Sequence, residues 1–316
     1  MSYSRILTAF CLVLICSRML AGTDHAVFRS ADRGRSWSRS DTGLPGNIRV
    51  NVFGAIGSVL LAGTERGIYV SRNQGLQWNA GAGAAVGSGR ILSLATLGST
   101  AYAGTDRGGI LTSTDGGASW ISNARVPFRY VRSLLAHAGM LYAGTDAQGV
   151  FVSRDGGSSW LAISRGLPGH AQIFSMEQSQ GRVYAGLYGR GLYAWFSREQ
   201  AWQRAGAVSP LVLASAGATL LAGHNPGGIR RSDDGGATWT PGQIAYSPDL
   251  GSAPVWELDA GPDLAIAGVA NGIYYSEDRG RTWVRAQNGL PAKSAGIAFY
   301  AGGGFVLAAA SIEHSR

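Results

Sequence analysis

The chain has 316 residues and a formal net charge of +8, and 48 of its residues are glycine. Hydrophobic residues make up 45% of the composition and charged residues 15%. This excludes an intrinsically disordered chain, because such chains are poor in apolar residues and rich in charge. The apolar runs are short and lack 3.6-residue periodicity, so the composition favours an all-β protein.

Residues 1–21 resemble a secretory signal peptide. Arg5 precedes eleven mostly apolar residues that end at Cys16, and small residues follow up to Ala21. This apolar stretch is too short to span a bilayer. We therefore expect export to the periplasm or the cell exterior, with residues 22–316 as the mature domain. Two alternatives remain open, namely lipid attachment at Cys16 and a first strand that begins at Arg5.

The cysteines and histidines argue against a metal site. Both cysteines, Cys11 and Cys16, fall within the signal-like segment, so the mature domain would contain no thiol and no disulfide. The five histidines show no spacing typical of metal ligands. We therefore expect no metal and no cofactor.

An eight-residue phrase, Ser-x-Asp-x-Gly-x-x-Trp, recurs along the rest of the chain. It is cleanest at Ser113 to Trp120, and a degraded copy at Trp195 to Trp202 has lost its serine, acid and glycine. The third position of the clear copies is, in chain order, Asp32, Asn73, Asp115, Asp155, Asp234 and Asp278. The closing residues of all copies, the degraded one included, are Trp37, Trp78, Trp120, Trp160, Trp202, Trp239 and Trp283. Their steps of 37 to 44 residues match the size of one four-stranded propeller blade.

The phrase is interpreted as a structural turn between two strands. Its acid can accept hydrogen bonds from nearby backbone N–H groups, and its glycine can adopt the positive φ that closes a tight turn. The tryptophan offers a large apolar ring to the gap between neighbouring blades and an indole N–H to a carbonyl. We therefore place none of these acids in an active site.

One repeat shows the expected blade plan. Val131 to His137 reads as the inner strand, Met140 to Gly144 as the second, Gly149 to Ser153 as the third and Trp160 to Ser164 as the outer strand. The Ser-x-Asp-x-Gly phrase then falls in the turn between the third and outer strands. An Ala-Gly pair recurs in the second strand of most repeats, where it allows close strand packing.

The two ends of the chain supply complementary halves of one blade. Val27 to Ser30 reads as a third strand followed by an outer strand, whereas Gly296 to Phe299 and Phe305 to Ala309 read as an inner and a second strand. Joining these halves gives a single propeller of seven four-stranded antiparallel blades without free edges. Three Gly-Leu-Pro segments, which begin at Gly43, Gly166 and Gly289, are interpreted as connectors from the rim back to the axis.

These residues resemble the Asp-box, or bacterial neuraminidase repeat, propellers. The regular spacing is most similar to the branch that contains photosystem II assembly factors and sortilin-type receptors, and the resemblance covers essentially the whole mature chain. Because the same motif occurs in sialidases, xyloglucan hydrolases, receptors and assembly factors, it implies the fold and leaves the function open.

A glycoside hydrolase, sialidase-like or related, is the alternative function. The Arg-Ile-Pro segment of sialidases is missing, and no long insertions build a catalytic site. The resemblance to xyloglucan hydrolases would imply two facing propellers, whereas this chain supplies one. Glu257, on an inner strand where Ser93, Ser133 and Ser175 stand in other repeats, is the single weak candidate for a catalytic acid.

A binding site is expected on the face that carries the loops between the second and third strands, because these loops vary from repeat to repeat. An arginine fork suits a carboxylate, sulfate or phosphate group. The candidate ligand or partner residues in these loops are Arg66, Arg107, Asp146, Tyr188, Arg190, His224, Asn225 and Asn271.

Two irregularities interrupt the repeats. The fifth repeat replaces its Asp-box residues and concentrates aromatic residues around Trp195 and Trp202, which is typical of a drifted turn held by aromatic packing, with a protein or sugar contact surface as the alternative. A long connection from Pro241 to Pro254 carries Tyr246 and Asp249 and is expected on the same face as the loop arginines.

The charge favours an anionic partner. Loss of residues 1–21 leaves a net charge of +6, so the surface should attract a protein client with an acidic segment or an acidic glycan, with peripheral contact to an anionic membrane as a further option. No basic run or nucleic-acid-binding module is present. We expect a monomeric, exported, non-catalytic scaffold for binding or assembly.

Overall fold

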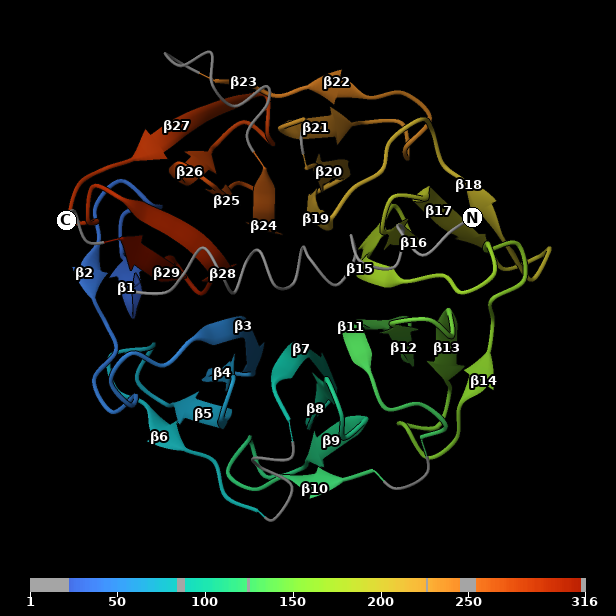
Figure 1. Cartoon of the computed structure of the whole chain (residues 1–316), viewed down its shortest axis with the longest axis horizontal. Coiled ribbons are helices and arrows are strands. Elements are labelled where there is room, and N and C mark those ends of the chain that lie inside the picture. The colour runs from blue at the N-terminus through green and yellow to red at the C-terminus, as the bar shows by residue number, and fades with distance from the viewer. Residues whose placement is uncertain (1–22, 84–88, 124–125, 226, 245–253, 314–316) are drawn as a thin grey trace, which may run out of the picture.

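The computed structural model describes residues 23–83, 89–123, 126–225, 227–244 and 254–313. Their strands form seven sheets arranged in a ring around a central axis (Figure 1). This confirms the predicted seven-bladed β-propeller. The signal-like residues 1–21, together with Tyr246 and Asp249 of the long connection, lie outside the described residues.

Six blades are contiguous in the chain and run from the inner strand to the outer strand. Blades 2, 3 and 4 consist of β3 (Val50–Ile56), β4 (Val59–Thr64), β5 (Gly67–Ser71) and β6 (Asn79–Ala80); β7 (Ile91–Leu97), β8 (Thr100–Thr105), β9 (Ile110–Ser113) and β10 (Ile121–Ser122); and β11 (Val131–His137), β12 (Met140–Thr145), β13 (Val150–Ser153) and β14 (Leu161–Ala162). Blades 5, 6 and 7 consist of β15 (Ile173–Ser179), β16 (Arg182–Leu187), β17 (Gly191–Phe196) and β18 (Ala201–Arg204); β19 (Val212–Ala216), β20 (Thr219–Gly223), β21 (Ile229–Ser232) and β22 (Thr240–Pro241); and β24 (Val255–Ala260), β25 (Ala265–Val269), β26 (Gly272–Ser276) and β27 (Thr282–Ala286).

Blade 1 joins the two ends of the chain, as the sequence predicts. Its strands are β28 (Ser294–Gly302), β29 (Phe305–Glu313), β1 (Thr23–Ser30) and β2 (Ser38–Arg39). β1 and β29 pair in antiparallel register from Thr23 opposite Glu313 to Ser30 opposite Val306. This pairing completes blade 1 and closes the ring.

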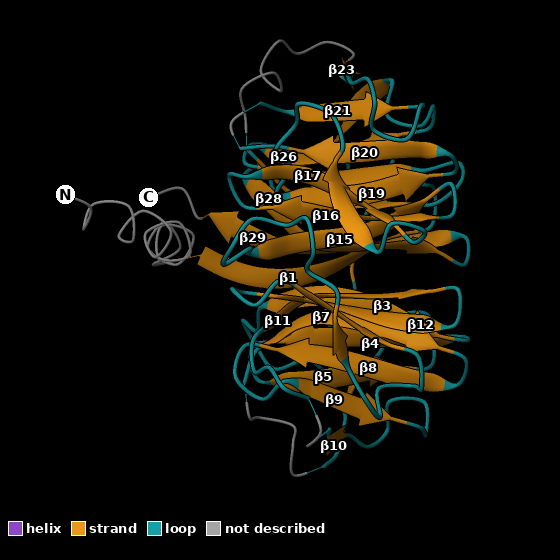
Figure 2. Cartoon of the chain, turned by 90° about the vertical axis from the view of Figure 1, so that its right-hand side faces the viewer, coloured by secondary structure: helices purple, strands orange, loops and turns teal. Residues whose placement is uncertain are grey.

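A short additional strand, β23 (Gln243–Ile244), pairs in parallel with β27 and widens the sheet of blade 7. In side view the molecule is a disc whose turns lie on two opposite faces, and β1 and β29 project beyond their neighbours on one of them (Figure 2). The described residues contain no helix with the length and apolarity needed to cross a membrane.

The Ser-x-Asp-x-Gly phrase forms the predicted turn between the third and outer strands. In blade 3 the Asp115 carboxylate accepts hydrogen bonds from the Ser113 hydroxyl (2.8 Å) and the Ser119 backbone N–H (2.9 Å). The Ser113 hydroxyl accepts the Gly117 N–H (2.9 Å), and the Trp120 indole donates to the Gly117 carbonyl (3.0 Å). Gly117 has a φ of +83°, a conformation that glycine adopts at little cost.

The core consists of apolar clusters between neighbouring blades. Trp78, Trp120 and Trp283 are each at most 1% exposed and lie in three of these clusters, which confirms their predicted place between blades. The Ala-Gly pairs allow the blades to approach closely. A Cβ added to Gly144 of β12 would lie 2.5 Å from the Cγ2 atom of Ile173 on the next inner strand.

Blade 5 replaces the Ser-x-Asp-x-Gly turn by a shorter turn, residues 197–200, and by aromatic packing. Trp195 and Trp202 face each other across β17 and β18, with their rings 5.4 Å apart. The Trp202 indole donates to the Ile163 carbonyl of blade 4 at 2.6 Å. The fifth repeat therefore keeps its contact with the preceding blade without an acid or glycine.

Candidate functional site

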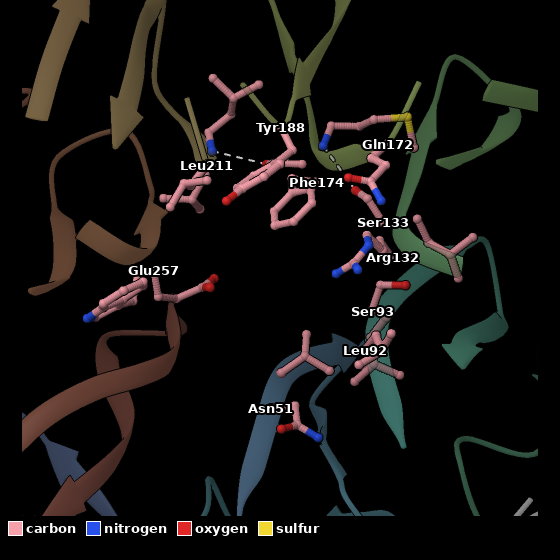
Figure 3. Close-up of a pocket in the computed structure, with 18 of the residues that line it drawn as sticks. Asn51, Leu92, Ser93, Arg132, Ser133, Gln172, Phe174, Tyr188, Leu211 and Glu257 are labelled. Carbon is pink, nitrogen blue, oxygen red and sulfur yellow. Dashed lines mark hydrogen bonds between the residues drawn. The ribbon is translucent and has the colours of Figure 1, made fainter. Parts of the chain in front are cut away.

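A cavity of about 460 Å³ opens at the axis, where the inner strands begin. Its walls come from the inner strands of blades 2 to 7, and Tyr188 reaches it from the loop between β16 and β17. We call this space the mouth cavity. Figure 3 shows the side chains of Arg132 and Glu257 pointing into it from opposite sides.

Three arginines line the mouth cavity at the start of successive inner strands: Arg49, Arg90 and Arg132. The Arg90 Nε atom donates to Asp106 at 2.8 Å, and the Arg132 Nε atom donates to Asp146 at 2.5 Å. These carboxylates hold two of the guanidinium groups in place. The Nε atom of Arg49 is buried and has no hydrogen-bond acceptor among the described residues, so no carboxylate holds this guanidinium group by its Nε atom.

Aromatic rings make up a second part of the wall. The ring of Phe174 stacks on that of Tyr188, with centroids 4.8 Å apart and an interplanar angle of 22°. The Arg132 guanidinium lies 4.5 Å from the Phe174 ring centroid and 4.8 Å from that of Tyr130. Such cation–π contacts fix the arginine and present a flat, partly apolar surface to the cavity.

Serines at one position of the inner strands join neighbouring blades. The Ser133 hydroxyl accepts the Met176 N–H at 3.0 Å, and the Ser175 hydroxyl accepts the Leu213 N–H at 3.0 Å. Ser93 occupies the same position opposite a glycine, but its buried hydroxyl has no hydrogen-bond partner. The mouth cavity thus contains one further unsatisfied polar atom.

Glu257 occupies the position that the sequence predicts, because it lies opposite Gly268 as Ser93 lies opposite Gly104. It lines both the mouth cavity and a second cavity of about 220 Å³ deeper in the channel. Burial raises the pKa of Glu257 well above its usual range, and the nearby Asp259 raises it further. Desolvation therefore favours the protonated form of this carboxyl over the carboxylate.

Two further carboxyls lie in the channel, and neither was predicted from the sequence. Burial raises the pKa of Glu177 to about 8 and that of Asp259 to about 6. Asp259 accepts the N–H groups of Ala260 (2.9 Å) and Ala301 (2.7 Å), and Glu177 accepts the N–H of Gln178 (2.9 Å). Within the described part of the chain, no group of three or more His, Cys, Asp or Glu side chains is arranged to hold a metal ion.

The predicted loop residues are divided between the cavity and the outer surface. Tyr188 lines the mouth cavity, and Asp146 contacts the lining residue Arg132. Arg66, Arg107 and Arg190 do not line it and are exposed. Arg66 lies 3.6 Å from Glu65, and Arg190 donates to the Gly169 carbonyl at 2.8 Å.

The three other loop residues also lie away from the mouth cavity. Burial lowers the pKa of His224, whose Nδ1 atom is 3.2 Å from the Ser209 carbonyl and whose Nε2 atom has no partner. Asn271 accepts the Tyr274 hydroxyl at 3.2 Å, and Asn225 is half-buried. Their role in ligand binding stays a prediction.

The arginines of the mouth cavity were not predicted, because basic ligand-binding residues were expected in the loops between the second and third strands. A signal was present, since Arg49 and Arg90 each come directly before the first residue of an inner strand. Residues that recur at the repeat position nearest the axis come together in the folded ring. Residues of the loops, in contrast, spread over the rim.

Comparison with known proteins supports the fold alone. No protein-family model and no curated protein matches the sequence. Among solved structures, the chain is similar to a YCF48 bound to D1 peptide (TM-score 0.66, 18% identity, covering 86% of this chain and 96% of that one). It is also similar to a GH74 xyloglucanase from Xanthomonas campestris (TM-score 0.64, 17% identity, covering 90% and 55%). A third similar structure is the extracellular domain of BT4673 from B. thetaiotaomicron (TM-score 0.69, 14% identity, covering 87% and 40%).

Proposed function

We propose that this protein is an exported, non-catalytic Asp-box β-propeller that binds an acidic segment of a partner protein at its mouth cavity. The observation that carries the proposal is the convergence of Arg49, Arg90 and Arg132 with stacked aromatic rings around one open space. Arginine and aromatic residues are the types enriched where proteins bind partners tightly.

The arrangement favours a carboxylate-bearing peptide over a neutral ligand. Arg49 and Arg90 line the same cavity, and the Arg90 side chain is 47% exposed despite its bond to Asp106. The two guanidinium groups therefore favour a partner carboxylate in this cavity. The Phe174 and Tyr188 rings would cover apolar atoms of the same peptide, because aromatic groups contribute contact area at a low entropy cost.

Two independent facts agree with this proposal. The signal-like residues 1–21 would deliver the protein outside the cytoplasm, and BT4673, of similar fold, provides an extracellular domain. A YCF48 of the same fold binds a peptide of D1. The partner of this chain is identified by the following experiment.

The test is photo-crosslinking in the native cell envelope with a benzoylphenylalanine residue in place of Gln172, which lines the mouth cavity. We expect a crosslinked protein whose attachment site is an acidic segment. The double variant Arg49→Glu, Arg90→Glu should lower the yield at least tenfold, since it places like charges opposite the ligand.

The matched control is Arg66→Glu, Arg107→Glu, which changes the net charge equally on the outer surface. Loss of crosslinking in the control alone would place the site on the loops instead, and an acidic polysaccharide that competes for the crosslink would identify a glycan ligand.

Glycoside hydrolysis is a second candidate because of one observation: the Glu257 carboxyl lines an open cavity, and burial raises its pKa. A general acid needs such a raised pKa. Turnover of sialoside or xyloglucan substrates that Glu257→Gln abolishes would support this function. We expect no turnover above background from either protein.

A further inference from the structure

The junction between blades 4 and 5 lacks the turn that closes the other junctions of the ring. At one position of the second strand, six of the seven blades place a side chain against an Asp-box glycine of the next blade. These contacts are Leu61 with Gly117, Tyr102 with Gly157, Tyr184 with Gly236, Leu221 with Gly280, Ile266 with Gly34 and Leu307 with Gly75. The corresponding residue of blade 4 is Tyr142, and blade 5 has no such glycine to meet it.

Tyr142 has lost the hydrogen-bond acceptor that its counterparts use. The Tyr102 hydroxyl donates to the Gly156 carbonyl at 3.0 Å, and the Tyr184 hydroxyl donates to the Gly235 carbonyl at 2.9 Å. Tyr142 is only 3% exposed, and its hydroxyl has the Met140 sulfur, 3.8 Å away, as its partner. A thioether is a weak acceptor, so the hydroxyl has no strong acceptor among the described residues.

A cavity of about 220 Å³ occupies the place of the missing turn. We call it the junction cavity. It is lined by His137, Met140, Tyr142, Arg154, Trp195 and Ser197, among others. Trp195 forms one wall, and the four-residue turn after Phe196 is too short to reach across. By its share of liquid volume the cavity would hold about seven waters, so it is large enough for a small polar ligand.

Arg154 adds a charge to the junction cavity. Its counterpart in blade 2, Arg72, lies against the Asp-box turn of blade 3, with guanidinium nitrogens 3.8 and 3.9 Å from where a Cβ of Gly116 would be. Arg154 is exposed, and its charge acts on the Tyr142 hydroxyl. Within the described residues its guanidinium takes part in no ion pair.

We propose that the junction cavity binds an acidic, glycine-containing turn of a partner polypeptide. The turn presents a backbone carbonyl to the Tyr142 hydroxyl and a carboxylate to Arg154. Two other junctions of the ring support this inference. In each of them a tyrosine hydroxyl at the position of Tyr142 donates to a glycine carbonyl of the next blade's turn. The cavity lies on the Asp-box face, opposite the mouth cavity, so this inference is independent of the proposed function.

The experiment uses a cyclised peptide with the sequence of residues 232–239, the turn whose Gly235 carbonyl bonds to Tyr184. Binding to the whole protein is followed by the NMR shift of the Trp195 indole N–H. We expect saturable binding that Tyr142→Phe weakens about three- to tenfold, the effect of one hydrogen bond. Arg154→Glu should weaken it tenfold or more, because a charge-assisted bond becomes a repulsion.

The matched control is Tyr102→Phe, which removes the same hydroxyl from a junction that is already filled. It should leave peptide affinity unchanged, and circular dichroism verifies that all variants are folded. Absence of saturable binding would overturn the proposal, as would equal effects of Tyr142→Phe and Tyr102→Phe. Saturation of the Trp195 signal by glucuronate, without binding of the peptide, would overturn it in favour of a sugar site.

Discussion

At the scale of single residues, the carboxyls of the channel are the groups with the strongest influence on pH dependence. Glu177, Glu257 and Asp259 form no ion pair among the described residues. Burial raises all three pKa values. A buried carboxyl without a cation is more stable protonated, because desolvation penalises the charged form.

This predicts that the protein loses stability as the pH rises. The folded protein holds the Glu177 proton up to about pH 8, whereas the unfolded chain releases it near the ordinary value of 4.5. Between these values the folded state binds more protons, so the free energy of unfolding falls with pH, by at most about 1.4 kcal/mol per pH unit for one group. Urea denaturation from pH 5 to 9 should show this decline.

The variant Glu177→Gln should flatten the decline and be more stable than the natural protein at pH 9. The exposed Glu199 provides the control, because Glu199→Gln should leave the pH profile unchanged. A profile for Glu177→Gln that still parallels the natural one would show that Glu177 is ionised in the folded state.

The acids of the Ser-x-Asp-x-Gly turns predict the opposite pH dependence, a loss of stability at low pH. Hydrogen bonds from Ser119 and Ser113 lower the pKa of Asp115 to about 2, so its contribution is present above the ordinary value of 3.8 and is lost as the pH falls through 2. We expect Asp115→Ala to lower the free energy of unfolding at pH 7 by about 1 kcal/mol, the net value of an exposed hydrogen-bonded turn. Asp115→Asn should lose less, because Asn73 accepts the equivalent bonds from Ser71 (3.0 Å) and Gln77 (2.9 Å). Equal losses would contradict this account.

At the scale of elements, each of the three Gly-Leu-Pro connectors links an outer strand to the next blade. Gly166 has a φ of +90°, and a Cβ there would lie 2.1 Å from the Trp202 carbonyl oxygen. The preceding Arg165 carbonyl accepts the Trp202 N–H at 2.8 Å. The connector therefore lies directly against the first residues of the next outer strand. It links two blades, as predicted, and it also packs against the second of them.

Gly166→Ala is expected to be strongly destabilising for two reasons. The added methyl group clashes with backbone that cannot move independently, and the left-handed conformation costs a non-glycine residue about 1–2 kcal/mol. The matched control is Gly169→Ala in the same connector, where a Cβ would have no atom within 4 Å. Thermal unfolding should show a lower midpoint for Gly166→Ala only, and a similar drop in both variants would contradict the packing argument.

At the scale of the whole molecule, closure of the ring depends on one strand pair from the two ends of the chain. β1 and β29 pair over the full length of β1, with Thr23 opposite Glu313. Removal of residues 23–39 would expose β29 as a long apolar edge, which favours aggregation.

A circular permutant tests this role of closure. Joining residues 23 and 313 by a short linker, and opening the chain in the exposed turn at Ala138 and Gly139, keeps every strand pair. We expect this permutant to unfold in one transition near the natural midpoint, as judged by circular dichroism. A variant that lacks residues 23–39 should aggregate, as seen by light scattering. Native-like melting of the truncated chain would show that closure by β1 is dispensable.

The sequence alone determined the blade count, the strand order and the pairing of the chain ends. These follow from local chemistry repeated at regular spacing, since each Ser-x-Asp-x-Gly phrase forms one turn and each closing tryptophan marks one outer strand. The tertiary structure decided which side chains meet. Arg49, Arg90 and Arg132 converge because their strands surround one axis, and Glu177 and Asp259 have raised pKa values because the inner strands place them in the channel. Tyr142 has lost its acceptor because blade 5 lacks the glycine-containing turn that supplies this acceptor in other blades. Such relations join residues of different blades, and a pattern within one repeat carries no information about them.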